Sequence, residues 1–198
     1  LYREQTGQYY FRRRSWAKVK EEIESYIAQY GVNYIYFNSE TFLAMGDEEF
    51  EGFLAMYRDI KLPFWMQTRI ETLTEKRIQG LEEVNCNRIS IGLEHGNEFF
   101  RNKIVGKGFS NDKMVETFKL FTQSKIPITV NNILGFPGET RALIFDTIML
   151  NRQLGADSYN AYYFTPYHGT EMRKDAVQKG YVEEDAETGT LMTGTRPE

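Results

Sequence analysis

The residues best suited to chemistry lie where a strand-like apolar run gives way to glycine. The clearest case is Asn131–Thr140 (NNILGFPGET), in which a predicted strand ends in a Gly-x-Pro-Gly turn and a helix begins at once. Glycine lets backbone approach a ligand closely, and the first turn of a helix attracts negative charge. The same residues also fit an ordinary strand-to-helix turn capped by Thr140, so both interpretations stay open.

A second such run is Ile89–Asn97 (ISIGLEHGN). Glu94 follows a predicted strand beside glycines, where a carboxylate can accept hydrogen bonds from a sugar diol or simply be solvated at a rim. We interpret His95 as a rim residue with satisfied hydrogen bonds. His168, the other histidine, has no acid or cysteine close to it in the sequence, so no metal site is indicated.

Two further runs place polar or aromatic side chains after strands. Asn38, Ser39 and Glu40 follow one strand and could hold an ammonium group, or the acid could belong to the start of the next helix. The run Tyr162–Thr170 (YYFTPYHGT) offers rings that could stack on a flat base, although rings in strands also form core.

Helical and strand-like periods alternate along the chain. We predict helices over 15–30, after Gly46, and over 74–84, 111–123, 140–155 and 170–179; predicted strands are 33–37, 64–68, 88–93, 128–134 and 158–165. This alternation indicates parallel βαβ units. A doubly wound sheet concentrates its site at one switch point, whereas a barrel gathers all strand ends at one mouth. Polar or turn residues follow all five predicted strands, which favours the barrel.

Composition narrows the function classes. The net charge of −4, with 41% hydrophobic and 26% charged residues, indicates an ordinary globular protein and argues against nucleic acid or an anionic membrane as partner. We interpret Arg12–Arg14 as a solvated face or a carboxylate clamp. Cys86 is the only cysteine, so the sequence supplies neither a disulfide nor a cysteine-built cluster. No apolar run approaches the ~20 residues of a membrane span, and we expect a cytoplasmic protein. The start at Leu1 suggests a fragment.

The order of these motifs resembles the radical S-adenosylmethionine (SAM) superfamily, in particular the branch often preceded by a cobalamin-binding domain. The resemblance covers residues 10–181 and is carried by seven segments: 10–15, 19–23, 35–42, 90–97, 105–108, 134–140 and 166–171. Members carry a Cys-x-x-x-Cys-x-x-Cys loop after their first strand, and this sequence does not contain it. It also has Asn38-Ser39-Glu40 where many relatives have an acidic pair or Gly-Gly-Glu.

The resemblance implies an α/β fold, a partial (β/α)6 TIM-like barrel of about five parallel strands with flanking helices. Residues 1–182 would be the C-terminal part of the core domain and 183–198 a loose tail. SAM would lie across the strand ends. Asn38, Ser39 and Glu40 would meet its ammonium group, and Arg69 and Lys107 are candidates for its carboxylate. Glu94 and Asn131 would approach the ribose, with Ile133, Gly135, Tyr163 and Phe164 near the adenine.

The resemblance also implies SAM and a [4Fe–4S] cluster as cofactors, the latter with ligands outside this sequence, and a cobalamin-binding N-terminal partner domain. The substrate stays open, and so does the reaction, since methyl transfer, methylthiolation, cyclisation and rearrangement all use this scaffold. We expect the chain alone to be inactive. The alternatives are a non-catalytic barrel that binds a nucleotide-like ligand or a partner protein and, less well supported, an aldolase or isomerase without the expected strand-end lysine.

Overall fold

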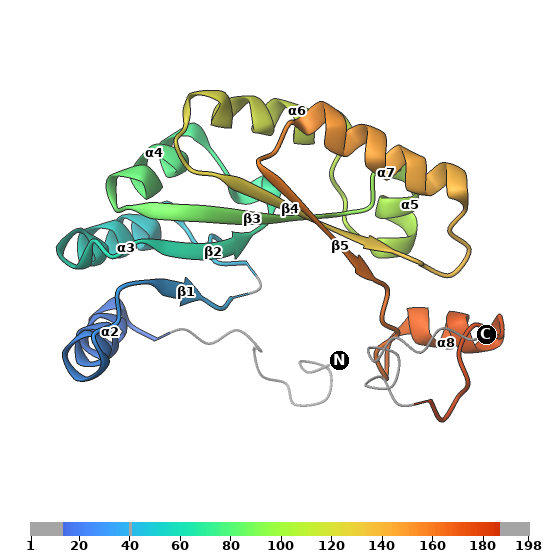
Figure 1. Cartoon of the computed structure of the whole chain (residues 1–198), viewed down its shortest axis with the longest axis horizontal. Coiled ribbons are helices and arrows are strands. Elements are labelled where there is room, and N and C mark those ends of the chain that lie inside the picture. Colours follow the sequence, from blue (N-terminus) through green and yellow to red (C-terminus); the bar gives the residue numbers. More distant parts are fainter. Residues whose placement is uncertain (1–13, 40, 187–198) are drawn as a thin grey trace. The chain divides into compact units, whose positions relative to one another are not determined.

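The computed structural model describes residues 14–39 and 41–186 and shows an α/β fold (Figure 1). Five strands form one sheet in sequence order: β1 (Ile35–Phe37), β2 (Phe64–Thr68), β3 (Cys86–Glu94), β4 (Ile128–Leu134) and β5 (Ser158–Tyr163). The longer helices are α2 (Trp16–Tyr30), α3 (Asp47–Ile60), α4 (Glu75–Glu83), α6 (Asn111–Leu120), α7 (Arg141–Leu154) and α8 (Glu171–Gln178). Each lies where the sequence predicts a helix. None of the helices in the described ranges has the length and apolar character that crossing a bilayer requires.

Two shorter elements were not predicted from the sequence. They are α5 (Glu98–Phe100) and the π-helical turn η2 (Arg101–Val105), which follow one another directly after β3. By contacts, the chain divides into two compact units. Unit 1 comprises Leu1–Ile89 and Gln123–Ile126, and unit 2 comprises Ser90–Thr122 and Pro127–Glu198.

Unit 1 has a ring-rich core between its strands and helices. Residues alternate along β2, so that Phe64, Met66 and Thr68 are buried on one face. The Phe37 ring of β1 lies 5.4 Å from the Phe64 ring and 5.9 Å from the Phe53 ring of α3. On the opposite face, the Tyr36 and Trp65 rings pair at 4.5 Å. The described phenylalanines of unit 1 are therefore largely core, whereas four of its tyrosines are exposed: Tyr26, Tyr30, Tyr34 and Tyr36.

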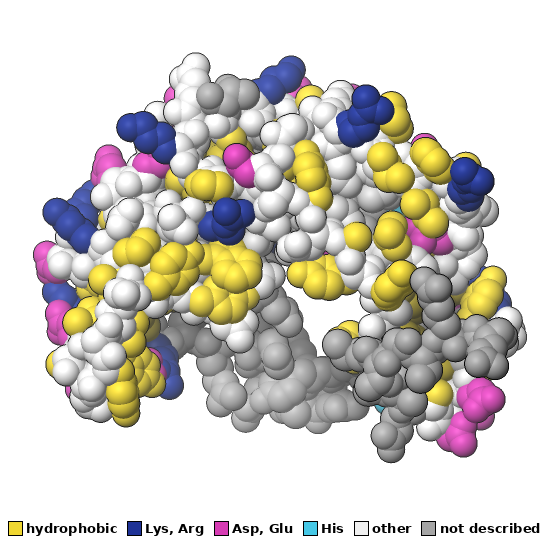
Figure 2. Space-filling model, viewed as in Figure 1, with side chains coloured by type: hydrophobic (Ala, Val, Ile, Leu, Met, Phe, Trp, Pro, Cys, Tyr) yellow, Lys and Arg dark blue, Asp and Glu magenta, His cyan; other side chains and the backbone are white. Residues whose placement is uncertain are grey.

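In unit 2, strands β4 and β5 pair in parallel from Thr129 opposite Ser158 to Leu134 opposite Tyr163. One face of this pair carries polar side chains at its start, where Thr129 Oγ1 lies 2.8 Å from Ser158 Oγ. The other face packs on α7, where Asn151 Nδ2 donates to Asn132 Oδ1 over 2.9 Å. Hydrophobic side chains remain exposed along α7 (Figure 2), including Phe145, Ile148 and Met149.

Three buried arginines hold irregular backbone in place. Arg77 of unit 1 donates to the carbonyls of Leu43, Met45 and Thr72. In unit 2, Arg101 donates to the carbonyls of His95 and Phe109, and Arg173 donates to those of Pro166, Glu184 and Ala186. A guanidinium group presents five N–H donors in a fixed plane, so one side chain satisfies several carbonyls that no strand or helix pairs.

Candidate functional site

The candidate site of unit 2 lies at the carboxyl end of β3. Glu94 has a φ of +66°, which is rare for a residue with a side chain. Its carboxylate lies 2.6 Å from Nζ of Lys107, and the two side chains are 16% and 24% exposed. A Cβ atom on Gly92 would come within 2.3 Å of the Glu94 carboxylate, so the glycine makes room for this ion pair. The structure thus joins two residues that the resemblance assigns to different parts of one ligand.

Strand β4 contributes Asn131 and Ile133 to the face opposite α7. Asn131 and Ile133 are partly exposed there, and Asn131 Oδ1 accepts a hydrogen bond from Asn160 Nδ2 at 3.0 Å. Because β3 and β4 are neighbours in the sheet, their carboxyl ends fall at the same edge. Glu94 and the turn at Gly135 therefore lie at one edge of the sheet, and Asn131 lies three residues (134 − 131) before the end of β4.

The turn after β4 has two left-handed glycines, Gly135 (φ +84°) and Gly138 (φ +80°). The Glu139 N–H donates to the Phe136 carbonyl over 2.9 Å, and the Glu139 carboxylate accepts from the Gly135 N–H. Although the turn itself is open to solvent, the Glu139 side chain is only 2% exposed. The acid of the Gly-Phe-Pro-Gly-Glu motif therefore points inward and braces its own turn.

The buried partner of Glu139 is His95, which the sequence did not suggest as a partner. His95 Nε2 lies 3.0 Å from Glu139 Oε1, and the His95 side chain is fully buried rather than at a rim. Its Nδ1 accepts from the Asn97 N–H at 3.0 Å, so the single proton of the neutral ring sits on Nε2, the atom close to the carboxylate. Burial lowers the pKa of His95, against the opposing effect of Glu139.

Aromatic rings extend this buried cluster. The His95 ring lies 4.4 Å from the Phe100 ring of α5, and Phe136 lies 5.8 Å from Phe100. Phe136 also lies 5.1 Å from Phe164, which follows β5. The predicted adenine neighbours therefore differ: Phe164 packs on the Gly135–Gly138 turn, whereas the Tyr163 side chain is 88% exposed.

Three of the predicted ligand residues belong to unit 1. The Ser39 N–H donates to the Phe37 carbonyl over 3.0 Å, directly after Asn38. Arg69 precedes a short 3-10 turn, and its guanidinium pairs with Glu71 at 2.5 Å. Glu40 lies outside the described residues, as do Arg12 and Arg13 of the basic segment and residues 187–198 of the predicted tail.

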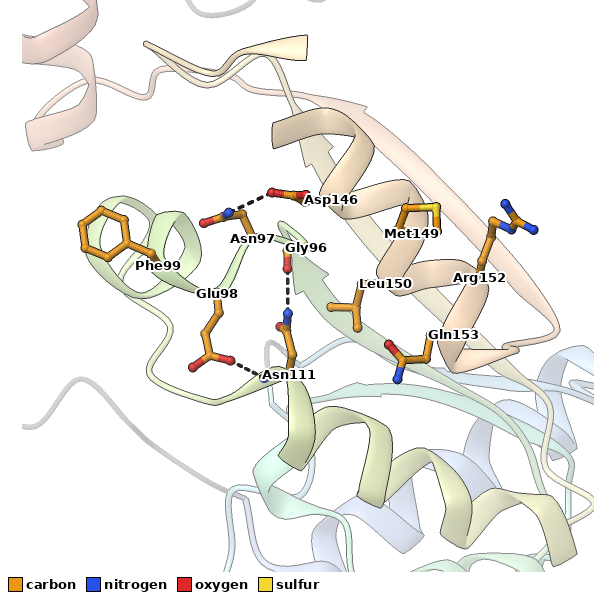
Figure 3. Close-up of a pocket in the computed structure, with 10 residues that line it drawn as sticks. All are labelled: Gly96, Asn97, Glu98, Phe99, Asn111, Asp146, Met149, Leu150, Arg152 and Gln153. Atoms are coloured by element: carbon orange, nitrogen blue, oxygen red, sulfur yellow. Dashed lines mark hydrogen bonds between the residues drawn. The ribbon is translucent and has the colours of Figure 1, made fainter. Parts of the chain in front are cut away.

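A groove of about 740 Å³ lies on the helical side of unit 2 (Figure 3). Asn97 donates to Asp146 of α7 at 2.8 Å, and Asn111 of α6 donates to the Gly96 carbonyl at 3.1 Å. Phe99 of α5 is 72% exposed. The groove is lined by none of the predicted ligand residues and is therefore separate from the candidate site.

Comparison with protein families shows which family contains this chain. The family model described as the radical SAM superfamily matches residues 2–150. The chain belongs to the radical SAM superfamily. Its fold class, an α/β partial TIM-like barrel with five parallel strands and flanking helices, agrees with the solved structures of that superfamily.

The relatives that resemble this radical SAM chain are considerably longer. It is 24% identical over 168 residues to the protein named uncharacterized methyltransferase PH0819 of Pyrococcus horikoshii, covering 84% of this chain and 36% of that protein. The radical SAM methyltransferase TsrM from Kitasatospora setae, solved with cobalamin and a [4Fe–4S] cluster, superposes with a TM-score of 0.62 at 18% identity, covering 76% of this chain and 31% of TsrM. The cobalamin-dependent SAM radical enzyme OxsB gives 0.59 at 14%, covering 87% and 27%. The chain thus spans about a third of these relatives.

The described residues of this radical SAM chain do not fit an iron–sulfur cluster. Cys86 is the only cysteine in the sequence, and burial raises the pKa of its thiol to about 12. A cluster ligand must be a thiolate, which this environment disfavours. Within residues 14–39 and 41–186, no group of three His, Cys, Asp or Glu side chains could hold a metal ion.

Proposed function

We propose that this chain is the SAM-binding and substrate-pocket part of a radical SAM enzyme. The observation that carries the proposal is the Glu94–Lys107 pair at the end of β3, beside Asn131 and the Gly135 turn on β4. Membership of the radical SAM superfamily supports the same ligand. SAM combines a carboxylate and an ammonium group with a ribose diol and a flat base, and the predicted residues match these parts in chemical type.

Glu94 and Lys107 can both hydrogen-bond to such a ligand while they remain paired with each other. A carboxylate offers about four lone-pair sites, so Glu94 can keep Lys107 and still accept hydrogen bonds from a diol. The Lys107 ammonium group has three donors and is 24% exposed, which leaves donors for a ligand carboxylate. Gly135 has no side chain, and a Cβ atom placed there would meet nothing within 4 Å, so a flat ring can approach the backbone closely.

The proposal assigns the cluster to residues outside this sequence, since the chain has no suitable ligands for it. It includes cobalamin held by a partner domain, and this is supported by the cobalamin bound to TsrM and the cobalamin dependence of OxsB. Methyl transfer is the reaction class with the most support, because PH0819 and TsrM are both named methyltransferases.

Calorimetric titration of the intact protein with SAM and with S-adenosylhomocysteine tests the proposal. We expect Glu94→Ala to weaken binding at least roughly tenfold, the equivalent of about 1.4 kcal/mol, because the variant removes the diol acceptor and frees Lys107. The matched control is Glu171→Ala, since Glu171 also pairs with a lysine but is 87% exposed on α8. An intact protein that binds neither compound would contradict the proposal and favour a non-catalytic barrel.

A further inference from the structure

We propose that His95 and Glu139 form a buried positioning pair that locks the Gly135–Gly138 turn against the end of β3, and so fixes Gly135 relative to Glu94. The inference rests on the proposed function, because Glu94 and Gly135 are the positions assigned to the ribose and adenine of SAM. Neither His95 nor Glu139 is assigned a contact with the ligand. They act through the backbone that they hold.

Burial of the Glu139 carboxylate is unfavourable unless other groups compensate its charge. Its side chain is 2% exposed, and a buried charge is tolerated only when it is paired and hydrogen-bonded. One oxygen accepts from Gly135, and Oε1 faces His95 Nε2 at 3.0 Å. The two atoms are in close contact without the alignment of a hydrogen bond, and in the described part of the chain neither has a hydrogen-bond partner elsewhere. Each group therefore depends on the other.

His95 is held by contacts to three neighbouring residues. Asn97 donates to Nδ1, which leaves Nε2 as the donor, and Arg101 donates to the His95 carbonyl over 2.7 Å. The ring packs on Phe100 at 4.4 Å, and Arg101 is wholly buried. The residue that contacts the turn is thus held through its ring, its Nδ1 and its carbonyl.

Both His95 and Glu139 adjoin backbone in unfavourable left-handed conformations. Gly135 and Gly138 adopt left-handed conformations, and glycine loses more conformational freedom on folding than any other residue. Glu94, the neighbour of His95, holds a positive φ that is unfavourable for a side chain of its size. The contact between His95 and Glu139 joins the two segments. It therefore opposes both the flexibility of the glycine turn and the relaxation of the strained backbone at Glu94.

Glu139→Gln in the intact protein tests the inference. Glutamine keeps the size of the side chain but presents one oxygen and one NH2, so it cannot place a carboxylate oxygen against both the Gly135 N–H and His95 Nε2. We expect affinity for S-adenosylhomocysteine to fall roughly tenfold. Amide hydrogen exchange at Gly135 and at His95–Asn97 should accelerate. The second readout needs no ligand.

Arg77→Lys is the matched control for lost stability alone. It breaks buried hydrogen bonds of unit 1 and should lower the melting temperature without changing exchange at Gly135 or affinity for the ligand. An unchanged Gly135 exchange rate in Glu139→Gln, or equal losses of affinity in both variants, would overturn the positioning role. Absence of binding by the unsubstituted protein would instead overturn the proposed function, and the exchange rates alone would then decide whether the pair locks the turn.

Discussion

The backbone N–H of Gly96 donates a hydrogen bond to Thr147 Oγ1 over 2.8 Å, which brings the loop after β3 into contact with the backbone of α7. A Cβ atom on Gly96 would lie 2.3 Å from Thr147 Cα and 2.5 Å from the Asp146 carbonyl oxygen. These atoms belong to the helix backbone and cannot rotate away. The site loop is therefore placed by a contact that only glycine permits.

Gly96→Ala should lower the free energy of unfolding by about 2–3 kcal/mol or more, because the helix and the loop must separate to admit a methyl group. Chemical denaturation measures the change. Gly108→Ala is the control, since its Cβ would meet nothing within 4 Å and its backbone is not left-handed. Equal stability of the two variants would contradict the close approach.

Acidification should destabilise the fold through His95. Because burial lowers its pKa in the folded state, the unfolded chain binds the proton more tightly, and stability falls as the pH drops below the ordinary histidine value of about 6.5. The loss should approach 1.4 kcal/mol per pH unit (an approximate upper limit) until the folded pKa is reached. Chemical denaturation at several pH values between roughly 7.5 and 5 measures this loss of unfolding free energy. His95→Gln should reduce the slope, whereas His168→Gln, at an exposed position, should leave it unchanged.

Arg101→Lys should destabilise unit 2 by about 2–4 kcal/mol, since an ammonium group cannot reach the carbonyls of His95 and Phe109 and the Asn111 side chain in the same geometry. Thermal unfolding provides the measurement. Arg58→Lys is the comparison, because Arg58 is half exposed and its pair with Glu83 spans 3.4 Å. That exchange should change stability by no more than about 0.5 kcal/mol.

The adjacent residues Tyr163 and Phe164 should respond differently to alanine. Phe164→Ala removes a ring 5.1 Å from Phe136 and should cost about 1–3 kcal/mol. Tyr163→Ala removes a side chain that is 88% exposed and should leave the melting temperature within error. If both variants melt alike, the packing of Phe164 on the turn is wrong.

Much of the fold could be predicted from local signals. Strands 64–68 and 128–134 were located to the residue, and Ser15, Thr74 and Thr140 cap the helices that follow them. Helices α5 and η2 were missed because three- and five-residue turns show no hydrophobic period. The apolar residues of α7 were visible in the sequence, but the structure exposes Ile148 and buries Thr147 beside Leu150 and Leu154, because Thr147 accepts a hydrogen bond from Gly96.

The candidate site was predictable by motif but not by contact. Glu94 and Glu139 each stood out beside glycines, and the resemblance supplied Lys107. The pairing of Glu139 with His95 joins residues 44 positions apart (139 − 95), and nothing in the spacing of either motif indicates it. The sequence did not reveal that these two side chains are buried, because histidine and glutamate are usually surface residues. The rings of Phe100 and Phe136 pack against the His95 ring and help to enclose it.

The three buried arginines have a consequence for how the protein responds to ionic strength. Arg77, Arg101 and Arg173 direct most of their hydrogen bonds to uncharged carbonyl oxygens rather than to carboxylates. Salt screens attraction between opposite charges that are open to solvent, but it has little effect on a buried bond to a neutral acceptor. The arginine contacts that fasten these loops should therefore withstand high salt, whereas the exposed ion pairs of the helices weaken in it.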